Sequence, residues 1–144
     1  MPHLVILYSG NLDARTDMSA LCRSLADTML AQRDEGGQAV FPPGGTRVLA
    51  YPAPHFAISD GGSAGRLAGG NGDYGFAWLN LRMGRGRSAA VQQRVGEALL
   101  ALAKAHFEPV MATMHLGVTL QIDVGAEVFD AKHSTLHPLF NKPG

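Results

Sequence analysis

The sequence predicts an α/β fold of the α+β type, in which two consecutive β-α-β units form one four-stranded sheet with two helices on one face. Two segments have a helical period, one at about 17–33 and one after residue 88, and an extended apolar segment flanks each of them on both sides. A β-α-β connection implies parallel pairing and a right-handed crossover. One face of such a sheet has no cover of its own, so we expect another subunit to supply it.

The composition excludes several classes of protein. A chain of 144 residues that is 46% hydrophobic can bury one sizeable core, which predicts a single domain over residues 1–144. The 12 basic and 12 acidic residues give zero formal charge, and this argues against a partner that is a nucleic acid or an anionic membrane. No run approaches the roughly 18 to 20 apolar residues of a membrane span, so a cytoplasmic location is expected.

The first half, at about 2–60, begins with a strand at 2–9 that is apolar on both faces and is therefore predicted to be central. Asp17 or Thr16 then caps the first helix. The single Cys22 cannot form an internal disulfide and lies on the apolar side of this helix, which indicates a thiol in the core. The apolar stripe consists of Met18, Leu21, Leu25, Met29 and Leu30.

The segment "TRVLAYPAPHFAIS" is strand-like but contains Pro52 and Pro54, which cannot donate to a ladder, so it is predicted to be an edge or bent strand. The Gly-rich residues 61–72 are predicted to be a flexible surface insertion between the two halves.

The second half, at about 73–125, begins with "DYGFAWLNLRMG", which is predicted to be a strand buried on both sides. Ser88 caps a second helix that ends near Pro109, or later if the proline only kinks it. The segment "GVTLQIDVG" is the last predicted strand, and residues 126–144 are expected to form an irregular C-terminal arm. The stripe of the second helix is Val91, Val95, Leu99 and Leu102.

Pro2 follows the initiator methionine, and removal of Met1 would leave a free secondary amine. An α-amine titrates near pH 8, so it is mostly protonated at neutral pH unless an apolar pocket or nearby guanidinium groups disfavour the charged form. Arg87 is suited to bind an acidic ligand because it precedes the helix cap Ser88, where free amides and the helix macrodipole favour an anion.

Four segments resemble one family: "MPHLV", "GGTR" ending at Arg47, "DYGFAWLNLRMGRGRS" at 73–88 and the C-terminal "LHPLF". With them the chain resembles the tautomerase superfamily, and within it the 5-carboxymethyl-2-hydroxymuconate isomerases. The resemblance implies a tautomerase-like fold, a homotrimer and a reaction without cofactor or metal. It also implies catalytic roles for Pro2, Arg47 and Arg87, with both arginines binding substrate carboxylates; Arg85 is a further substrate-binding candidate.

The implied reaction converts 5-carboxymethyl-2-hydroxymuconate to its 2-oxo isomer in the breakdown of homoprotocatechuate, with Pro2 as general base and then general acid. The expected substrate is an unsaturated dicarboxylate or tricarboxylate. Two alternatives stay open: a tautomerase of another enol acid such as a phenylpyruvate-like compound, and a tautomerase-fold binding protein without activity if Met1 is retained.

Other residues suggest different chemistry. The arginine-rich "RMGRGR" suggests a nucleic-acid binder, but the chain is neutral and no aromatic residue interrupts this run. His133 and His137 have the i, i+4 spacing of metal ligands, yet the tail offers no third ligand. His106 is predicted to be a packed or hydrogen-bonded core histidine. Three aromatic residues are candidates for a pocket wall or for a subunit interface: Tyr74, Phe76 and Trp78.

Overall fold

The structure is a computed structural model that describes residues 2–141. Its helices and strands are β1 (His3–Ser9), α1 (Met18–Leu30), β2 (Arg47–Ala53), α2 (Ser63–Leu67), β3 (Tyr74–Gly84), α3 (Ala89–Met111) and β4 (His115–Gly125). Short 3-10 helices lie between or after them: η1 (Gly10–Ala14), η2 (Pro43–Gly45) and η3 (His137–Phe140).

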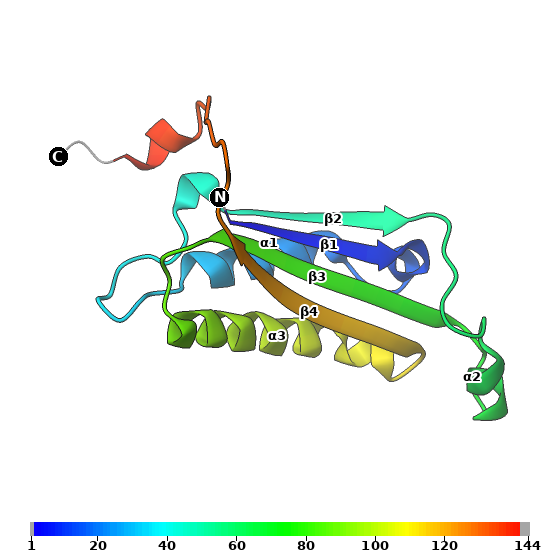
Figure 1. Ribbon diagram of the computed structural model, residues 1–144. Coiled ribbons are helices and arrows are strands. Elements are labelled where there is room, and N and C mark those ends of the chain that lie inside the picture. The colour runs from blue at the N-terminus through cyan, green and yellow to red at the C-terminus, as the bar shows by residue number, and fades with distance from the viewer. Residues whose placement is uncertain (1, 142–144) are drawn as a thin grey trace.

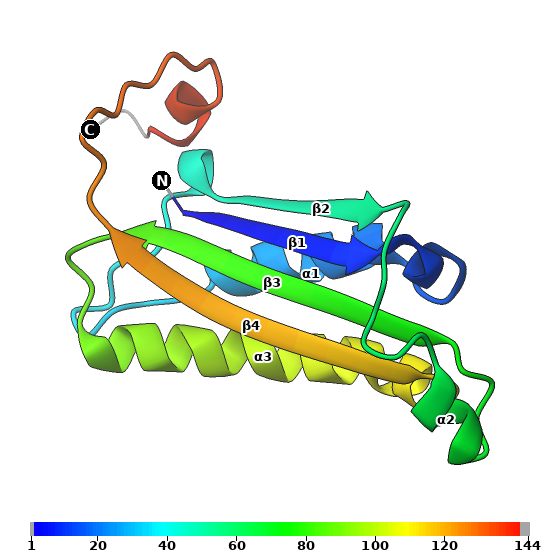
Figure 2. The same cartoon turned by 45° about the vertical axis from the view of Figure 1, so that its right-hand side comes forward.

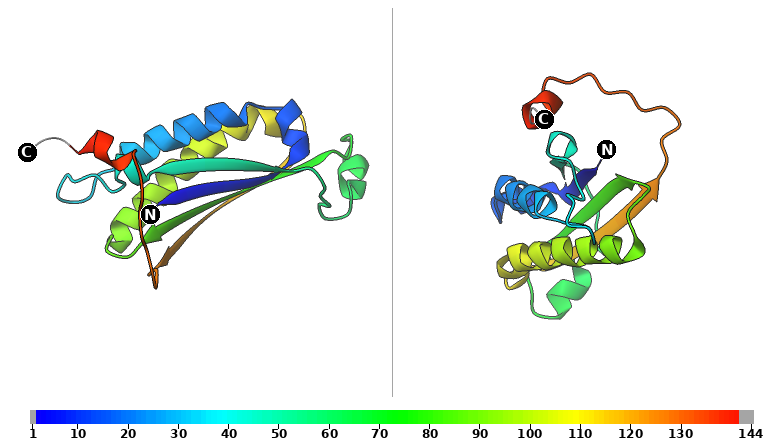
Figure 3. Two further views of the ribbon diagram at one scale, coloured as in Figure 1. Left: turned by 90° about the horizontal axis from the view of Figure 1, so that it is seen from above. Right: turned by 90° about the vertical axis from the view of Figure 1, so that its left-hand side faces the viewer.

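The four strands form one sheet in the order β2-β1-β3-β4 (Figure 1). Strand β1 pairs in parallel with β2, and β3 pairs in parallel with β4, whereas β1 and β3 are antiparallel. Helices α1 and α3 lie side by side on one face of this sheet (Figure 3). The predicted fold class is confirmed, including a central first strand and an edge position for the second.

Each helix buries one stripe of side chains against the sheet. The α1 stripe is buried except for the predicted Leu30, which is half-buried, and the inward residues of β1, Leu4 and Ile6, have no exposed surface. Asp17, rather than Thr16, caps α1 by accepting a hydrogen bond from Ala20 N at 3.0 Å. Within residues 2–141 none of the helices combines the length and apolarity that a membrane crossing requires. The buried residues of α3 are Val91, Val95, Leu99, Ala103, Phe107 and Val110.

The end of α1 differs from the prediction, and the end of α3 decides between two alternatives that the sequence left open. Helix α1 ends at Leu30 and not at 33, because the chain then turns around Asp34. The Asp34 carboxylate accepts from the backbone N–H groups of Gly36 and Gln38, both at 2.9 Å, and such local bonds compete with a helix. Helix α3 continues through Pro109 to Met111, so the proline does not end it.

The Gly-rich segment at 61–72 was predicted to lack regular structure, and this is wrong because it contains the one-turn helix α2. The Asp60 carboxylate organises it by accepting from Gly62 N at 3.0 Å and Ala64 N at 2.9 Å. The Tyr74 hydroxyl accepts from Gly65 N at 2.9 Å and fixes α2 to the start of β3. The glycine content of the segment predicted flexibility, and it did not reveal that Asp60 and Tyr74 supply these oxygen acceptors.

The sheet face opposite the helices has no cover within the described chain, as predicted. It exposes large apolar side chains, among them Leu7 at 43%, Leu49 at 44% and Phe76 at 40%. The arm that follows β4 is irregular up to η3, which packs against η2: a Cβ added to Gly44 would lie 3.0 Å from the His137 Cα. The last three residues of the predicted arm, 142–144, lie outside the described residues.

Candidate active site

Pairing in the sheet brings Pro2 close to one of the predicted arginines. Strand β1 begins at His3, whose Cα partners are Arg47 on β2 and Arg82 on β3. Pro2 is buried and precedes this row by one residue. We call this end of the sheet, where β1 and β2 begin and β3 and β4 end, the proline end; α2 lies at the opposite end (Figure 2).

Arg47 is the first residue of β2 and is half-buried. Its Nη1 donates to the Gly45 carbonyl at 3.0 Å, a local bond that holds the side chain beside η2. A guanidinium group has five N–H donors in a fixed fork. Arg47 therefore retains donors that can bind a carboxylate next to Pro2.

Arg87 follows the last residue of β3 after a two-residue connection and is also half-buried. Its Nη2 donates to the Val40 carbonyl at 2.8 Å and its Nη1 to the Gly84 carbonyl at 3.2 Å. The guanidinium carbon lies 5.9 Å from the centre of the Phe41 ring. These contacts fix the group at the proline end, and its other N–H donors can bind an anion.

The N-terminus of α3, which was predicted to favour an anion, lies beside a carboxylate of the chain itself. Ser88 caps α3 as predicted, accepting from Val91 N at 3.2 Å, but its hydroxyl also donates to the Glu35 carboxylate at 2.5 Å. This bond lowers the pKa of Glu35. A carboxylate of the chain itself thus lies at the positive end of the helix, brought there by a loop whose path the sequence did not predict.

Arg85 is exposed and, among residues 2–141, has no hydrogen-bond or ion-pair partner. It lines a cavity of about 260 Å³ together with Glu35, Gly86 and Arg87. Gly86 has a φ of +114°, a conformation that favours glycine, and it turns the chain between the two arginines. Pro2 and Arg47 do not line this cavity, so a single chain does not enclose the three predicted catalytic residues in it.

His3 and Arg82, for which no role was predicted, lie together at the proline end. Both line a cavity of about 200 Å³ with Met83, Gly125 and Glu127, among others. Burial lowers the pKa of His3, and nearby positive charges, including Arg47 and Arg82, lower it further, whereas Glu127 acts in the opposite direction. Alternation along β1 and β3 places both on the face opposite the buried residues, but only the register of the two strands makes them neighbours.

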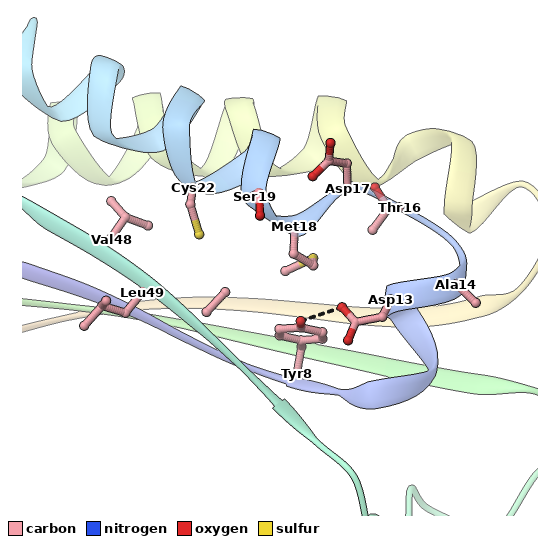
Figure 4. Close-up of a pocket in the computed structure, with 11 residues that line it drawn as sticks. Tyr8, Asp13, Ala14, Thr16, Asp17, Met18, Ser19, Cys22, Val48 and Leu49 are labelled. Atoms are coloured by element: carbon pink, nitrogen blue, oxygen red, sulfur yellow. Dashed lines mark hydrogen bonds between the residues drawn. The ribbon is translucent and has the colours of Figure 1, made fainter.

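A wider cavity of about 810 Å³ lies between α1 and β2 (Figure 4). The Tyr8 hydroxyl donates to the Asp13 carboxylate there at 2.6 Å; burial and this bond raise the pKa of Tyr8 to about 12. Cys22, half-buried against the core as predicted, lines it with a thiol pKa that burial raises. The cavity contains Asp13 and Asp17 and none of the predicted site residues, so it is poorly suited to an acidic substrate.

The remaining candidates lie elsewhere. Tyr74 is at the end of the sheet opposite Pro2, with its ring 6.0 Å from that of His115, so it does not wall a pocket around Pro2. The Trp78 Nε1 donates to the Gln121 Oε1 at 2.8 Å on the open face. His106 is half-buried and hydrogen-bonded to the Thr16 hydroxyl at 2.8 Å, as predicted. Residues 2–141 contain no group of three or more metal-ligating side chains.

Several known proteins are similar to this chain over nearly its full length. A sequence model of 5-carboxymethyl-2-hydroxymuconate isomerase matches residues 2–140. A solved 5-carboxymethyl-2-hydroxymuconate delta-isomerase is 65% identical, with a TM-score of 0.96 over 100% of this chain and 95% of its own. A solved 5-carboxymethyl-2-hydroxymuconate isomerase from Deinococcus radiodurans R1 is 28% identical, with a TM-score of 0.79 over 98% of this chain and 95% of its own. An Escherichia coli 5-carboxymethyl-2-hydroxymuconate Delta-isomerase is 26% identical over 140 residues, which are 97% of this chain and 99% of the relative.

The four-stranded sheet with two helices on one face, which the chain shares with solved isomerases, identifies it as an isomerase of the tautomerase type. The chain belongs to the 5-carboxymethyl-2-hydroxymuconate isomerase family. The resemblance found in the sequence is therefore confirmed.

Proposed function

We propose that this protein converts 5-carboxymethyl-2-hydroxymuconate to its 2-oxo isomer, with the Pro2 amine as general base and then general acid. Family membership supports the substrate. The observation that supports the site is the strand pairing at the proline end, where Pro2 immediately precedes His3 and His3 is the Cα partner of Arg47. Arg87 is fixed at the same end by the Gly84 carbonyl.

In the proposed reaction the Pro2 nitrogen takes the proton of the 2-hydroxyl group. The electron pair of the broken O–H bond forms the 2-oxo group, the double bonds shift along the chain, and a distant carbon receives the proton from the prolyl ammonium. Arg47 and Arg87 bind substrate carboxylates, orient the substrate and stabilise the negative charge that develops. Because only a proton and double bonds move, the reaction needs no redox cofactor.

The mechanism requires an uncharged amine at Pro2, which exists only after Met1 is removed; Met1 lies outside the described residues. Burial of Pro2 disfavours the charged ammonium form. Arg47 is the Cα partner of His3, the residue that follows Pro2, and its positive charge disfavours the ammonium form further. Both effects bring the amine towards the working pH at which a general base is most effective.

The protein is further proposed to act as a homotrimer in the cytoplasm. The open sheet face supports self-association because it exposes Leu7, Leu49 and Phe76. The arm supports it as well, since Val128 and Phe129 are more than four-fifths exposed there. A neighbouring subunit would bury these side chains and close the site around Pro2, whereas a stable monomer in sedimentation experiments would contradict the trimer.

Protein whose loss of Met1 has been verified by intact mass tests the proposal. It should isomerise 5-carboxymethyl-2-hydroxymuconate, and Pro2→Ala should lower kcat by about 10²- to 10⁴-fold. Pro54→Ala is the matched control, because Pro54 is exposed and lies outside β2, and its activity should be unchanged. The wild-type rate should rise with pH as the Pro2 amine loses its proton.

Two results would change the assignment in different ways. If the trimmed protein ketonises phenylpyruvate-like enols but not 5-carboxymethyl-2-hydroxymuconate, the substrate is wrong and the class of reaction stands. If protein from its native host retains Met1 and turns over neither compound, the binding protein without activity is the correct reading.

A further inference from the structure

The substrate of the proposed function has one carboxylate more than the two predicted arginines account for. A muconate carries two terminal carboxylates, and its 5-carboxymethyl substituent adds a third. Each carboxylate moved from water into a closed site needs a hydrogen-bonding or charged partner. With Arg47 and Arg87 assigned to two of them, the third is left for Arg85, which shares its cavity with the carboxylates of Asp34 and Glu35, or for other groups at the proline end.

His3 and Arg82 are placed to do so. They are Cα partners in the antiparallel β1–β3 ladder, and side chains directly opposite in such a ladder share a face. Both line the cavity of about 200 Å³, and His3 is the residue next to Pro2. An acidic group bound between them would therefore lie at the proline end, one residue along the chain from the proposed catalytic amine.

The acidic residues near this cavity form no ion pair with Arg82 within the described chain. Across the four strands, the Cα partners at this level are Arg47, His3, Arg82 and Asp123. The Asp123 carboxylate accepts a hydrogen bond from the Asn80 Nδ2 at 2.9 Å and does not pair with Arg82. Arg82 forms no ion pair among residues 2–141. The acidic residue that does line the cavity is Glu127, which lies on the irregular arm and not on the sheet.

The shape of the cavity also leaves room for a small acidic group. Gly125 ends β4 at its wall, and a Cβ added there would meet no other atom within 4 Å. A carboxymethyl group is only a few atoms larger than such a side chain. The cavity thus has free space beside Gly125, and the Glu127 carboxylate, which also lines it, competes for the same positive charge.

We infer that His3 and Arg82 form a third carboxylate subsite, which binds the 5-carboxymethyl carboxylate of the substrate. The inference rests on the proposed function. It assigns Arg82 a role in substrate specificity: Arg82 distinguishes a triacid from a diacid and does not take part in the proton transfer. Glu127 weakens this binding by its negative charge.

The test compares 5-carboxymethyl-2-hydroxymuconate with 2-hydroxymuconate, which lacks the carboxymethyl group. Arg82→Gln should raise KM for the triacid about 10- to 100-fold, the usual loss when one partner of a charged hydrogen bond is removed. Its KM for the diacid and its kcat for both compounds should stay within about twofold of wild type. Arg82→Lys should recover most of the triacid affinity, because it restores the charge.

Arg23→Gln is the matched control, since Arg23 is an exposed arginine on α1 that pairs with Asp27. It should change neither KM. Glu127→Gln should act in the opposite direction to Arg82→Gln and lower KM for the triacid about three- to tenfold, by removing the competing charge.

Equal effects of Arg82→Gln on triacid and diacid would overturn the subsite and leave the proposed function intact. An unchanged KM for the triacid in Arg82→Gln would do the same. If wild-type protein without Met1 turned over neither compound, the proposed function itself would fail, and the subsite with it.

Discussion

The two ends of the sheet treat charge differently. At the end opposite Pro2, which we call the insertion end because it carries α2, charged groups bind one another. Arg15 forms an ion pair with Asp73 at 2.6 Å, and the Asn11 Nδ2 donates to the same carboxylate at 3.0 Å. The Asp60 carboxylate accepts two backbone N–H groups. Charge at this end stabilises local structure and leaves little for a ligand.

At the proline end the guanidinium groups bind only neutral carbonyls or have no partner among the described residues. Arg47 and Arg87 donate to backbone oxygens, while Arg82 and Arg85 form no ion pair there. Guanidinium groups without an ion-pair partner in the described chain keep N–H donors for an acidic ligand. We infer from this comparison that the insertion end serves the fold and that the proline end serves binding, and each prediction below tests this difference.

The largest expected effect comes from removing one arginine at each end. Arg87→Met should lower kcat/KM for the enol substrate by about 10²- to 10³-fold, the usual cost of losing one donor to developing negative charge. Arg15→Met should leave kcat/KM within about twofold and cost about 1 kcal/mol or less in unfolding free energy, because its ion pair is partly exposed. Steady-state kinetics and urea unfolding measure the two quantities.

Arg87 also holds the Val40 and Gly84 carbonyls, so a structural loss must be separated from a catalytic one. Arg87→Lys keeps the charge but not the fork of donors. It should fold normally and remain well below wild-type activity. A variant at Arg15 that lost as much activity as Arg87→Met would show that the two ends are not functionally distinct.

A smaller effect is expected from one substitution, glycine to alanine, made at both ends. Gly10 joins β1 to η1 at the insertion end, and a Cβ there would lie 2.8 Å from the Ala53 carbonyl oxygen. Because backbone must move to relieve this contact, Gly10→Ala should lower the unfolding free energy by about 1 to 3 kcal/mol. Gly84→Ala is the matched control at the proline end, where the nearest atom is 3.8 Å away, and should stay within about 0.5 kcal/mol of wild type.

Urea unfolding at neutral pH measures both glycine variants, and folded Gly10→Ala should retain the wild-type KM. A rise in its KM comparable to the loss in stability would mean that the insertion end does shape the site.

The sequence predicted the parts of this comparison that depend on local pattern. Ser88 was predicted as the cap of the second helix, Asp17 or Thr16 as the cap of the first, and Pro52 and Pro54 indicated an edge or bent strand. Pro2 could be named from its place behind the initiator methionine, and Arg47 from the resemblance of "GGTR" to the family. These assignments depend on neighbours in the chain, which a single sequence displays.

What the sequence missed depends on contacts between distant segments. Glu35 lies 53 positions before Ser88, yet its carboxylate lies at the N-terminus of α3. His3 and Arg82 become neighbours only through the register of an antiparallel pair. No local pattern encodes either contact, so the charge balance at the proline end could not be derived before the strands were paired.

The smallest expected effect is a change in histidine pKa with salt, and it distinguishes burial from nearby charge as the cause of a lowered pKa. His3 at the proline end and His106 on α3 both have a pKa below the ordinary value of 6.5. Burial is the main cause for each. For His3 positive charges add to it, whereas for His106 the nearby Asp17 acts in the opposite direction. Salt screens charge but does not change burial.

Raising the salt to about 1 M, where the Debye length is about 3 Å, should therefore move the His3 pKa up and leave that of His106 in place or slightly lower. NMR titration of the two imidazoles measures both. Since each imidazole protonates less readily in the folded than in the unfolded chain, the unfolded chain binds more protons at mildly acidic pH. Stability should be complete above about pH 6.5 and decrease as the pH falls through that value. High salt should reduce the part of this decrease that His3 contributes; an equal response of both histidines would mean that the proline end carries no excess of positive charge.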